Sequence, residues 1–192
     1  MGLSVTERVG TYLRTEEVKG MWAWTALRLL LGWSFVWAFL DKMFGLGFAT
    51  CRIDDGTIDL LCDSAMIQGG SPTYGFLNFA TQGSHTGFLV EWMAPSAPDA
   101  INLADVGFML ALIFGGLSLM LGIGVRIGAI GAAGLMAFMF LAGDVWPENN
   151  PINSSHVIEM VAFLGIAYVG AGRFSLQEWF ESWAPSWLGW VR

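Results

Sequence analysis

Residues 146–173 read WPENNPINSSHVIEMVAFLGIAYVGAGR, and this stretch decides the fold. The prolines and asparagines near its start form a turn that no helix continues through, and the asparagine and serines just before His156 can cap the helix that follows. His156 and Glu159 are three residues apart, so they share one face at the beginning of that helix. An apolar run comes after them. We therefore predict a membrane helix with a polar pair at its mouth, and we expect function at that mouth.

The composition is that of a membrane protein. Of the 192 residues, 55% are hydrophobic and only 13% are charged, and the chain contains ten Trp and 25 Gly. Tryptophan is enriched at membrane interfaces, and small residues allow helices to approach closely in lipid. A formal net charge of −7 argues against nucleic acid binding, which needs basic surfaces.

The apolar runs predict an all-α membrane protein, a bundle of four transmembrane helices in one domain over residues 1–192. About 20 apolar residues cross about 30 Å of hydrocarbon. Asn102 and Asp105 have the spacing of an N-cap and an acid in the first turn, and they mark where the second span begins. The expected spans are residues 21–40, 104–122, 128–142 and 156–173, with an amphipathic interfacial helix at residues 3–19 and a tryptophan-rich interfacial helix at the C-terminus.

A loop at residues 43–101 is too long to be a simple connection, and we expect short helices that lie on the bundle as an outer lid. It carries Cys51 and Cys62, whose spacing is neither that of a C-x-x-C redox motif nor that of a zinc site. Outside the cytoplasm such a pair oxidises, so we predict a Cys51–Cys62 disulfide. A structural bridge is the first interpretation. A catalytic, cycling disulfide is the alternative, although no nearby residue obviously lowers a thiol pKa.

Four spans place both termini on one side of the membrane. The positive-inside rule compares the basic residues of the two sides. It predicts a multi-pass protein of the inner or plasma membrane with both termini in the cytoplasm and the lid outside. The basic residues on the predicted inner side are Arg8, Arg14, Lys19, Arg126, Arg173 and Arg192, against Lys42 and Arg52 outside.

Polar residues from all four spans fall at the outer membrane surface and predict a pocket under the lid. Lys42 and His156 would attract and orient an anion, and His156 titrates near neutrality. Glu159 lies about one turn deeper, at the start of an apolar run, and we expect it to pass protons. In the alternative reading, the carboxylates are solvated helix ends and His156 caps its own helix. The candidate catalytic residues are His156, Glu159, Lys42 and Asp41, with Asp105 and Asp144 at the same level.

Arg28 lies inside the first span, about 18 Å below its outer end. An arginine at that depth costs several kcal/mol unless it is paired or reaches a headgroup. The same depth on the other spans holds Ser118 and Tyr168, and Tyr168 is the best hydroxyl partner. We expect Arg28, Tyr168 and Ser118 to hold a quinone carbonyl. Alternatively, Arg28 snorkels to the inner headgroups, or it and Tyr168 satisfy each other.

Other cofactor chemistry has little support in the sequence. No G-x-G-x-x-G follows a strand, and there is neither a P-loop nor a C-x-x-C-H motif. His85 stands in the lid without a paired ligand, so we expect neither metal nor haem. A transporter is also disfavoured, because no span is broken in its middle.

With these features in place, the chain resembles the DoxX/DoxD family of four-helix membrane proteins. The family usually has an acid where Gln177 stands here. The resemblance is carried by four groups of residues: Arg28, Leu31, Gly32, Phe35 and Lys42; Gly116, Leu119, Leu121, Gly122 and Arg126; Asn150, Pro151 and His156; and Gly170, Ala171, Gly172, Arg173, Ser175 and Leu176.

The resemblance implies a membrane subunit linked to quinone and, in the DoxD branch, to oxidation of thiosulfate to tetrathionate. The leading hypothesis is therefore a quinone-linked oxidoreductase subunit that takes electrons from a small sulfur compound at the outer face. Its expected partners are membrane lipid, quinone and either protein subunits or further copies of itself. The alternative is a non-catalytic anchor or assembly subunit whose lid and tail bind a larger complex.

Overall fold

The computed structural model describes residues 5–53, 56–145, 154–172 and 174–183. Within these ranges the chain is helical without a strand, and one isolated antiparallel bridge joins Arg52 and Ile58. Three stretches are long and apolar enough to cross a membrane: Gly20–Phe44, Leu103–Leu121 and Val125–Gly143. The protein is therefore a helical membrane protein.

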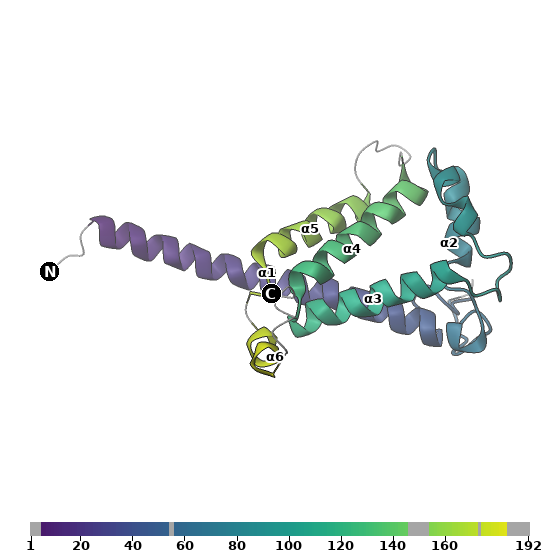
Figure 1. Ribbon diagram of the computed structural model, residues 1–192, viewed down its shortest axis with the longest axis horizontal. Helices are drawn as coiled ribbons and strands as arrows, with labels where there is room; N and C mark the ends of the chain where they lie inside the picture. The colour runs from purple at the N-terminus through teal and green to yellow at the C-terminus, as the bar shows by residue number, and fades with distance from the viewer. Residues whose placement is uncertain (1–4, 54–55, 146–153, 173, 184–192) are drawn as a thin grey trace.

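The bundle consists of four long helices, and Figure 1 shows them running roughly along one axis. They are α1 (Val5–Phe44), α3 (Leu103–Leu121), α4 (Val125–Met139) and α5 (Ser155–Val169). A short helix, α6 (Gln177–Trp183), lies at the end where α3 turns into α4. We call the segment between α1 and α3, residues 45–102, the lid; it gathers at the opposite end. It contains α2 (Tyr74–Asn78) and the 3-10 turns η1 (Met66–Gln68), η2 (Ala80–Gly83), η3 (Gly87–Leu89) and η4 (Glu91–Met93).

Helix α1 is one continuous helix of 40 residues. The sequence predicted a separate interfacial helix at residues 3–19, followed by a span at residues 21–40. Instead, the backbone stays helical through Gly20 and on to Phe44, and the first half of α1 extends beyond the bundle in Figure 1. One glycine costs a helix only about 1 kcal/mol, which the long apolar run after it readily offsets.

The predicted helix starts of α3 and α5 are confirmed. The Asn102 side chain accepts hydrogen bonds from the N–H groups of Ala104 and Asp105, and the Asp105 carboxylate in turn accepts from Asn102 N–H, which completes a capping box. Ser154 caps α5 by accepting from Val157 N–H. The predicted turn before it, at residues 146–153, lies outside the described residues.

Glycines set how closely α1 and α3 approach. A Cβ placed on Gly116 would lie 2.8 Å from Cγ2 and 2.9 Å from the backbone nitrogen of Val36. A Cβ on Gly32 would lie 2.9 Å from the Leu119 Cβ. Both distances are too short for a real side chain. The two backbones therefore touch only because both positions are glycine, as expected for helices packed in lipid.

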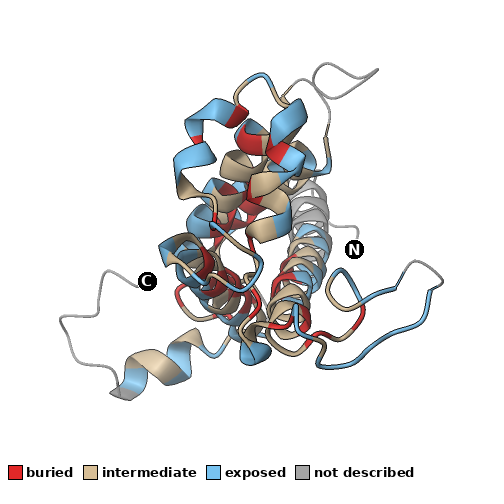
Figure 2. Ribbon diagram, turned by 90° about the vertical axis from the view of Figure 1, so that its right-hand side faces the viewer, coloured by how far each residue is buried: buried red, intermediate tan, exposed pale blue. Residues whose placement is uncertain are grey.

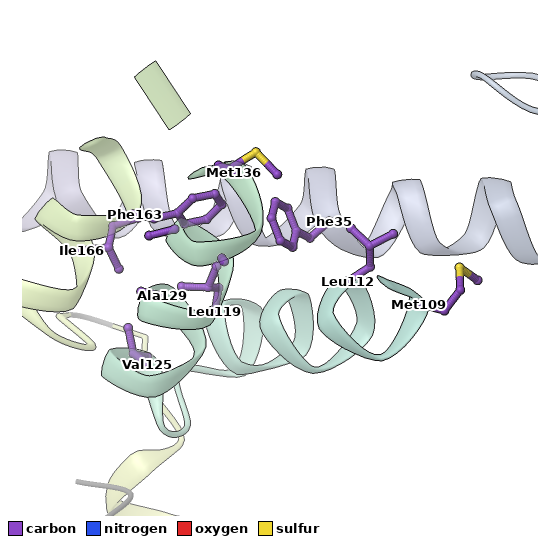
Figure 3. Close-up of a cluster of buried hydrophobic side chains, with 11 residues drawn as sticks. Phe35, Met109, Leu112, Leu119, Val125, Ala129, Met136, Phe163 and Ile166 are labelled. Carbon is purple, nitrogen blue, oxygen red and sulfur yellow. The ribbon is translucent and has the colours of Figure 1, made fainter. Parts of the chain in front are cut away.

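The middle of the bundle is filled by apolar side chains. Phe35 of α1 and Phe163 of α5 meet edge to face, with ring centroids 5.0 Å apart. Leu119 and Ile166 are wholly buried beside them, and Figure 3 shows this cluster between the helices. Edge-to-face rings and close packing stabilise the bundle beyond the area they bury. The centre of the bundle is thus a packed core.

The outer surface of the helices is also apolar. Large apolar side chains on all four long helices are more than half exposed, including Leu30, Phe114, Ile130 and Ile158. Figure 2, seen from the lid end, shows buried residues on the inner sides of the helices and exposed ones on the outer sides. An apolar surface of this extent would be a liability in water and is what a helix presents to lipid.

Helix α5 is shorter than its neighbours. It ends at Val169, four residues before the predicted end at residue 173, because Gly170 follows in a conformation with φ of +88°. At 15 residues it is about 22 Å long. It runs back alongside α4 in Figure 1.

Candidate functional site

Asp41, near the end of α1, holds the first segment of the lid. Its Oδ1 accepts a hydrogen bond from Phe48 N–H at 2.8 Å, and its Oδ2 accepts from the N–H groups of Ala49 and Thr50, each at 3.0 Å. The side chain is 1% exposed. Hydrogen bonds to a charged acceptor are worth about 1.5–3 kcal/mol each. Asp41 therefore fixes the bend at residues 48–50 that leads to Cys51.

Asp105, in the first turn of α3, holds a second part of the lid. Its Oδ1 accepts from Ser71 Oγ at 2.8 Å, from Thr73 N–H at 2.8 Å and from Thr73 Oγ1 at 2.7 Å. The side chain is fully buried. This carboxylate thus caps its own helix and fixes the entry to α2 at the same time.

A third attachment comes from the end of α4, where residues Phe140–Asp144 form a π-helical turn. A π turn leaves carbonyl groups without their usual α-helical partners. The Thr86 hydroxyl donates to the Leu141 carbonyl, and His85 N–H donates to the Val145 carbonyl at 3.1 Å. The lid is therefore fixed to α1, α3 and α4.

The predicted disulfide is present. Cys51 and Cys62 are bonded, with their Cα atoms 5.6 Å apart. A Cβ on Gly45 would lie 2.3 Å from the Cys51 sulfur, so the disulfide packs directly against the glycine that ends α1. The disulfide joins the two ends of the segment from Cys51 to Cys62, which directly follows the bend held by Asp41.

A cavity of about 1050 Å³ lies between the lid and the ends of α1, α3 and α4. Its wall is mainly apolar, and among the described residues its charged members are Lys42 and Arg52. Further polar groups come from the lid and from the start of α3. Its apolar side includes Phe76, Leu77, Trp92, Phe108, Leu135, Phe138 and Met139, and its polar side includes Ser71, Thr73, Tyr74 and Asn102.

Of the four predicted catalytic residues, the structure brings one to this pocket. Lys42 lines it, whereas Asp41, next to it, faces the backbone of the lid. His156 and Glu159 are half-buried on the first turns of α5 and do not line the cavity. The pocket is therefore formed by the lid and by the ends of α1, α3 and α4. It is not formed by a layer of polar residues from all four helices.

Arg28 is at the far end of the bundle from this pocket, and it is fully buried. Its Nη1 donates to the Leu119 carbonyl at 2.7 Å, in the last turn of α3, and its Nη2 donates to the Phe174 carbonyl at 3.0 Å. Carbonyl groups in the last turn of a helix lack partners and attract a cation. Arg28 thus joins the end of α3 to the segment between α5 and α6.

The predicted group of Arg28, Tyr168 and Ser118 does not form. Tyr168 is 88% exposed on the outside of α5. Ser118 donates instead to the Ile123 carbonyl at 2.7 Å, across the turn between α3 and α4. Arg28 is buried, Ser118 is bonded within its own turn, and Tyr168 is on the outer surface, so the three side chains do not meet.

The residues around Arg28 form a hydrogen-bonded cluster that the sequence analysis did not predict. Ser175 donates to the Gly122 carbonyl at 2.7 Å, and Gln177 accepts from Gly124 N–H at 2.9 Å. Gln177 stands where the resembled family has an acid, and its amide oxygen accepts just as a carboxylate would. Two sequence features could have predicted this cluster: the glycines at the α3–α4 turn and the Ser175-Leu176-Gln177 run.

The pocket wall was also missed, because it is built from ordinary apolar residues. Gly107 of α3 lines it, and a Cβ there would meet no atom within 4 Å. Within the described chain, no three His, Cys, Asp or Glu side chains are grouped as a metal site. The geometry therefore offers a ligand cavity with Lys42 at one wall.

Comparisons of this chain with protein-family models, with curated proteins and with solved structures find no match. The function proposed for this protein therefore rests on the geometry of the pocket.

Proposed function

We propose that the protein is the membrane subunit of a quinone-linked oxidoreductase, and that quinone binds in the pocket under the lid. The observation that carries this proposal is a ligand-sized, mainly apolar cavity with Lys42 in its wall. The small sulfur compound that would supply the electrons approaches from the lid side.

The residues present fit a quinone. Pockets for small ligands usually have volumes of about 300–1,000 Å³ and a few polar groups in an apolar lining. Phe76, Phe108 and Phe138 offer flat apolar surfaces to a ring and to an isoprenoid tail. Lys42, Tyr74 and Asn102 are hydrogen-bond donors for carbonyl oxygens. This combination suits a molecule with an apolar body and two polar edges.

The proposal includes four membrane crossings, with α5 as the fourth. Its neighbour in the bundle is α4, and Phe163 and Ile166 bury its inner face in the common core. A short apolar helix is accommodated when the bilayer thins around it. Four crossings and the distribution of basic residues then put the termini in the cytoplasm and the lid outside, in the inner or plasma membrane.

The electron balance needs no further cofactor. A bound quinone accepts two electrons and two protons. Two thiosulfate ions that join to form tetrathionate release two electrons, the reaction that the DoxD resemblance implies. Lys42 would place a positive, hydrogen-bonding group beside the oxygen on which negative charge develops.

Binding of a short-chain quinone to the purified protein tests the proposal. Gly107→Phe places a ring in the cavity, where a Cβ at this position meets no atom within 4 Å. Gly131→Phe adds the same ring on α4, where a Cβ also meets nothing within 4 Å and which is not part of this cavity's lining. We expect quinone to quench tryptophan fluorescence in the wild type and in Gly131→Phe, and to bind at least tenfold more weakly to Gly107→Phe. Lys42→Ala should lose about tenfold in affinity, the value of one hydrogen bond. Equal binding by both glycine variants would refute the pocket assignment.

A second candidate, a partner-binding subunit, is supported by the outer surface of the lid. Phe79 and Phe88, which do not line the pocket, are 63% and 65% exposed. Exposed aromatic residues are typical of protein interfaces. Purification in a mild detergent separates the two functions: a stoichiometric partner without quinone binding favours the second.

A further inference from the structure

The disulfide lies at the wall of the pocket. Cys51 lines the cavity between Thr50 and Arg52, and Cys62 is bonded to it from outside the lining. Each cysteine is only partly buried. A bond that only braced the lid could lie anywhere within it, yet this one borders the space that we assign to quinone.

The surrounding residues hold Cys51 in place. Asp41 fixes residues 48–50 just before it, and Asp59 N–H donates to the Cys51 carbonyl at 3.0 Å just across the loop. Its φ of +64° is in the left-handed region, which side chains with a Cβ rarely adopt. Such a conformation persists where neighbouring contacts impose it. These contacts therefore hold Cys51 at the cavity wall. Its disulfide partner Cys62 is not among the lining residues.

We propose that the Cys51–Cys62 pair is redox-active and carries electrons from a dithiol substrate to quinone in the pocket. This inference rests on the proposed quinone site and replaces the pair of thiosulfate ions with one organic dithiol as the sulfur donor at the lid face. The two cysteines have separate roles. Cys62 exchanges with the substrate, and Cys51 faces the quinone.

The first half-reaction oxidises the substrate. One substrate thiolate attacks the Cys62 sulfur, which breaks the Cys51–Cys62 bond, forms a mixed disulfide and releases Cys51 as a thiolate. The second substrate thiol then attacks the mixed disulfide and releases Cys62. The substrate leaves as a disulfide, and the cysteine pair has gained two electrons and two protons.

The second half-reaction restores the cysteine pair. Cys51 and Cys62 re-form their bond and give up two electrons and two protons, which convert quinone to quinol. Lys42, in the same wall, donates a hydrogen bond to the oxygen that takes up this charge. The net reaction is dithiol plus quinone to disulfide plus quinol.

The test uses the full-length protein, reduced with an immobilised phosphine that is then removed. A short-chain quinone is added without oxygen. Quinol is followed by absorbance, and free thiols are followed by a gel shift with maleimide–polyethylene glycol. We expect one quinol per protein and the loss of both thiols, at least tenfold faster in the wild type and in Gly131→Phe than in Gly107→Phe. Cys62→Ser should form neither the bridge nor a stoichiometric amount of quinol.

The outcomes separate this inference from the function on which it rests. If quinone quenches fluorescence normally but the thiols oxidise equally fast in both glycine variants, the redox role is refuted and the quinone site stands. A protein mass increased by one quinone, without quinol, would mean alkylation and would also refute the relay. If quinone does not bind at all, both proposals fail.

Discussion

Replacing Arg28 with methionine should destabilise the bundle strongly and leave the pocket intact. The guanidinium donates to the buried carbonyl of Leu119 and to the partly buried carbonyl of Phe174. At about 1.5–3 kcal/mol for each hydrogen bond to a charged group, their loss amounts to about 3–6 kcal/mol. Arg28→Lys should give an intermediate loss, because one ammonium does not reproduce the planar fork that reaches both carbonyls.

The assay is equilibrium unfolding in mixed micelles of increasing sodium dodecyl sulfate. Arg126→Met is the matched control, since Arg126 is exposed at the start of α4 near the same end of the bundle. It should shift the free energy of unfolding by no more than about 0.5 kcal/mol. An Arg28→Met protein that is as stable as the wild type but no longer binds quinone would refute the structural role and restore Arg28 as a ligand.

Three further predictions concern helix packing, the lid and the pocket wall. Gly116→Ala should cost about 1–3 kcal/mol in the same unfolding assay, because its Cβ meets Val36 at 2.8 Å; Gly131→Ala, with open space around it, should be neutral or stabilising. Asp105→Ala should speed proteolysis of the lid about tenfold or more through the lost bonds to Ser71 and Thr73, whereas Asp99→Ala, an exposed position, should not; equal digestion rates would contradict the anchoring role. His156→Ala should change the quinone dissociation constant less than twofold, because His156 is outside the pocket wall, and a larger loss would return it to the site.

Local signals in the sequence predicted the elements well. The capping box at Asn102 and Asp105, the Ser154 cap and the Cys51–Cys62 bridge are all present as expected. Each depends on residue type and on spacing along a few residues. The three long apolar helices follow from composition in the same way.

Side-chain partners across the bundle could not be predicted in this way. The partners of Arg28 are backbone carbonyls, which every residue has and no motif marks. Tyr168 was expected to face Arg28, yet the rotation of α5 turns it outward. Asp41 and Asp105 looked like catalytic or solvated carboxylates, and only the folded lid supplies the N–H and hydroxyl groups that they bind.

The pocket illustrates the same limit. Its aromatic and aliphatic wall has no chemistry that a spacing rule detects, and among its members the sequence singled out Lys42 and Cys51 as site residues. The continuous α1 shows a different limit: the change from a polar to an apolar sequence near residue 20 predicted two helices, but the backbone stays helical across it.

Photo-crosslinking with an azido-quinone, followed by peptide mass spectrometry, tests the central claim most directly. The account predicts adducts within residues 103–108 of α3 and 135–139 of α4, reduced at least tenfold in Gly107→Phe and unchanged in Gly131→Phe. Adducts at Tyr168, or a pattern that Gly107→Phe does not alter, would contradict it.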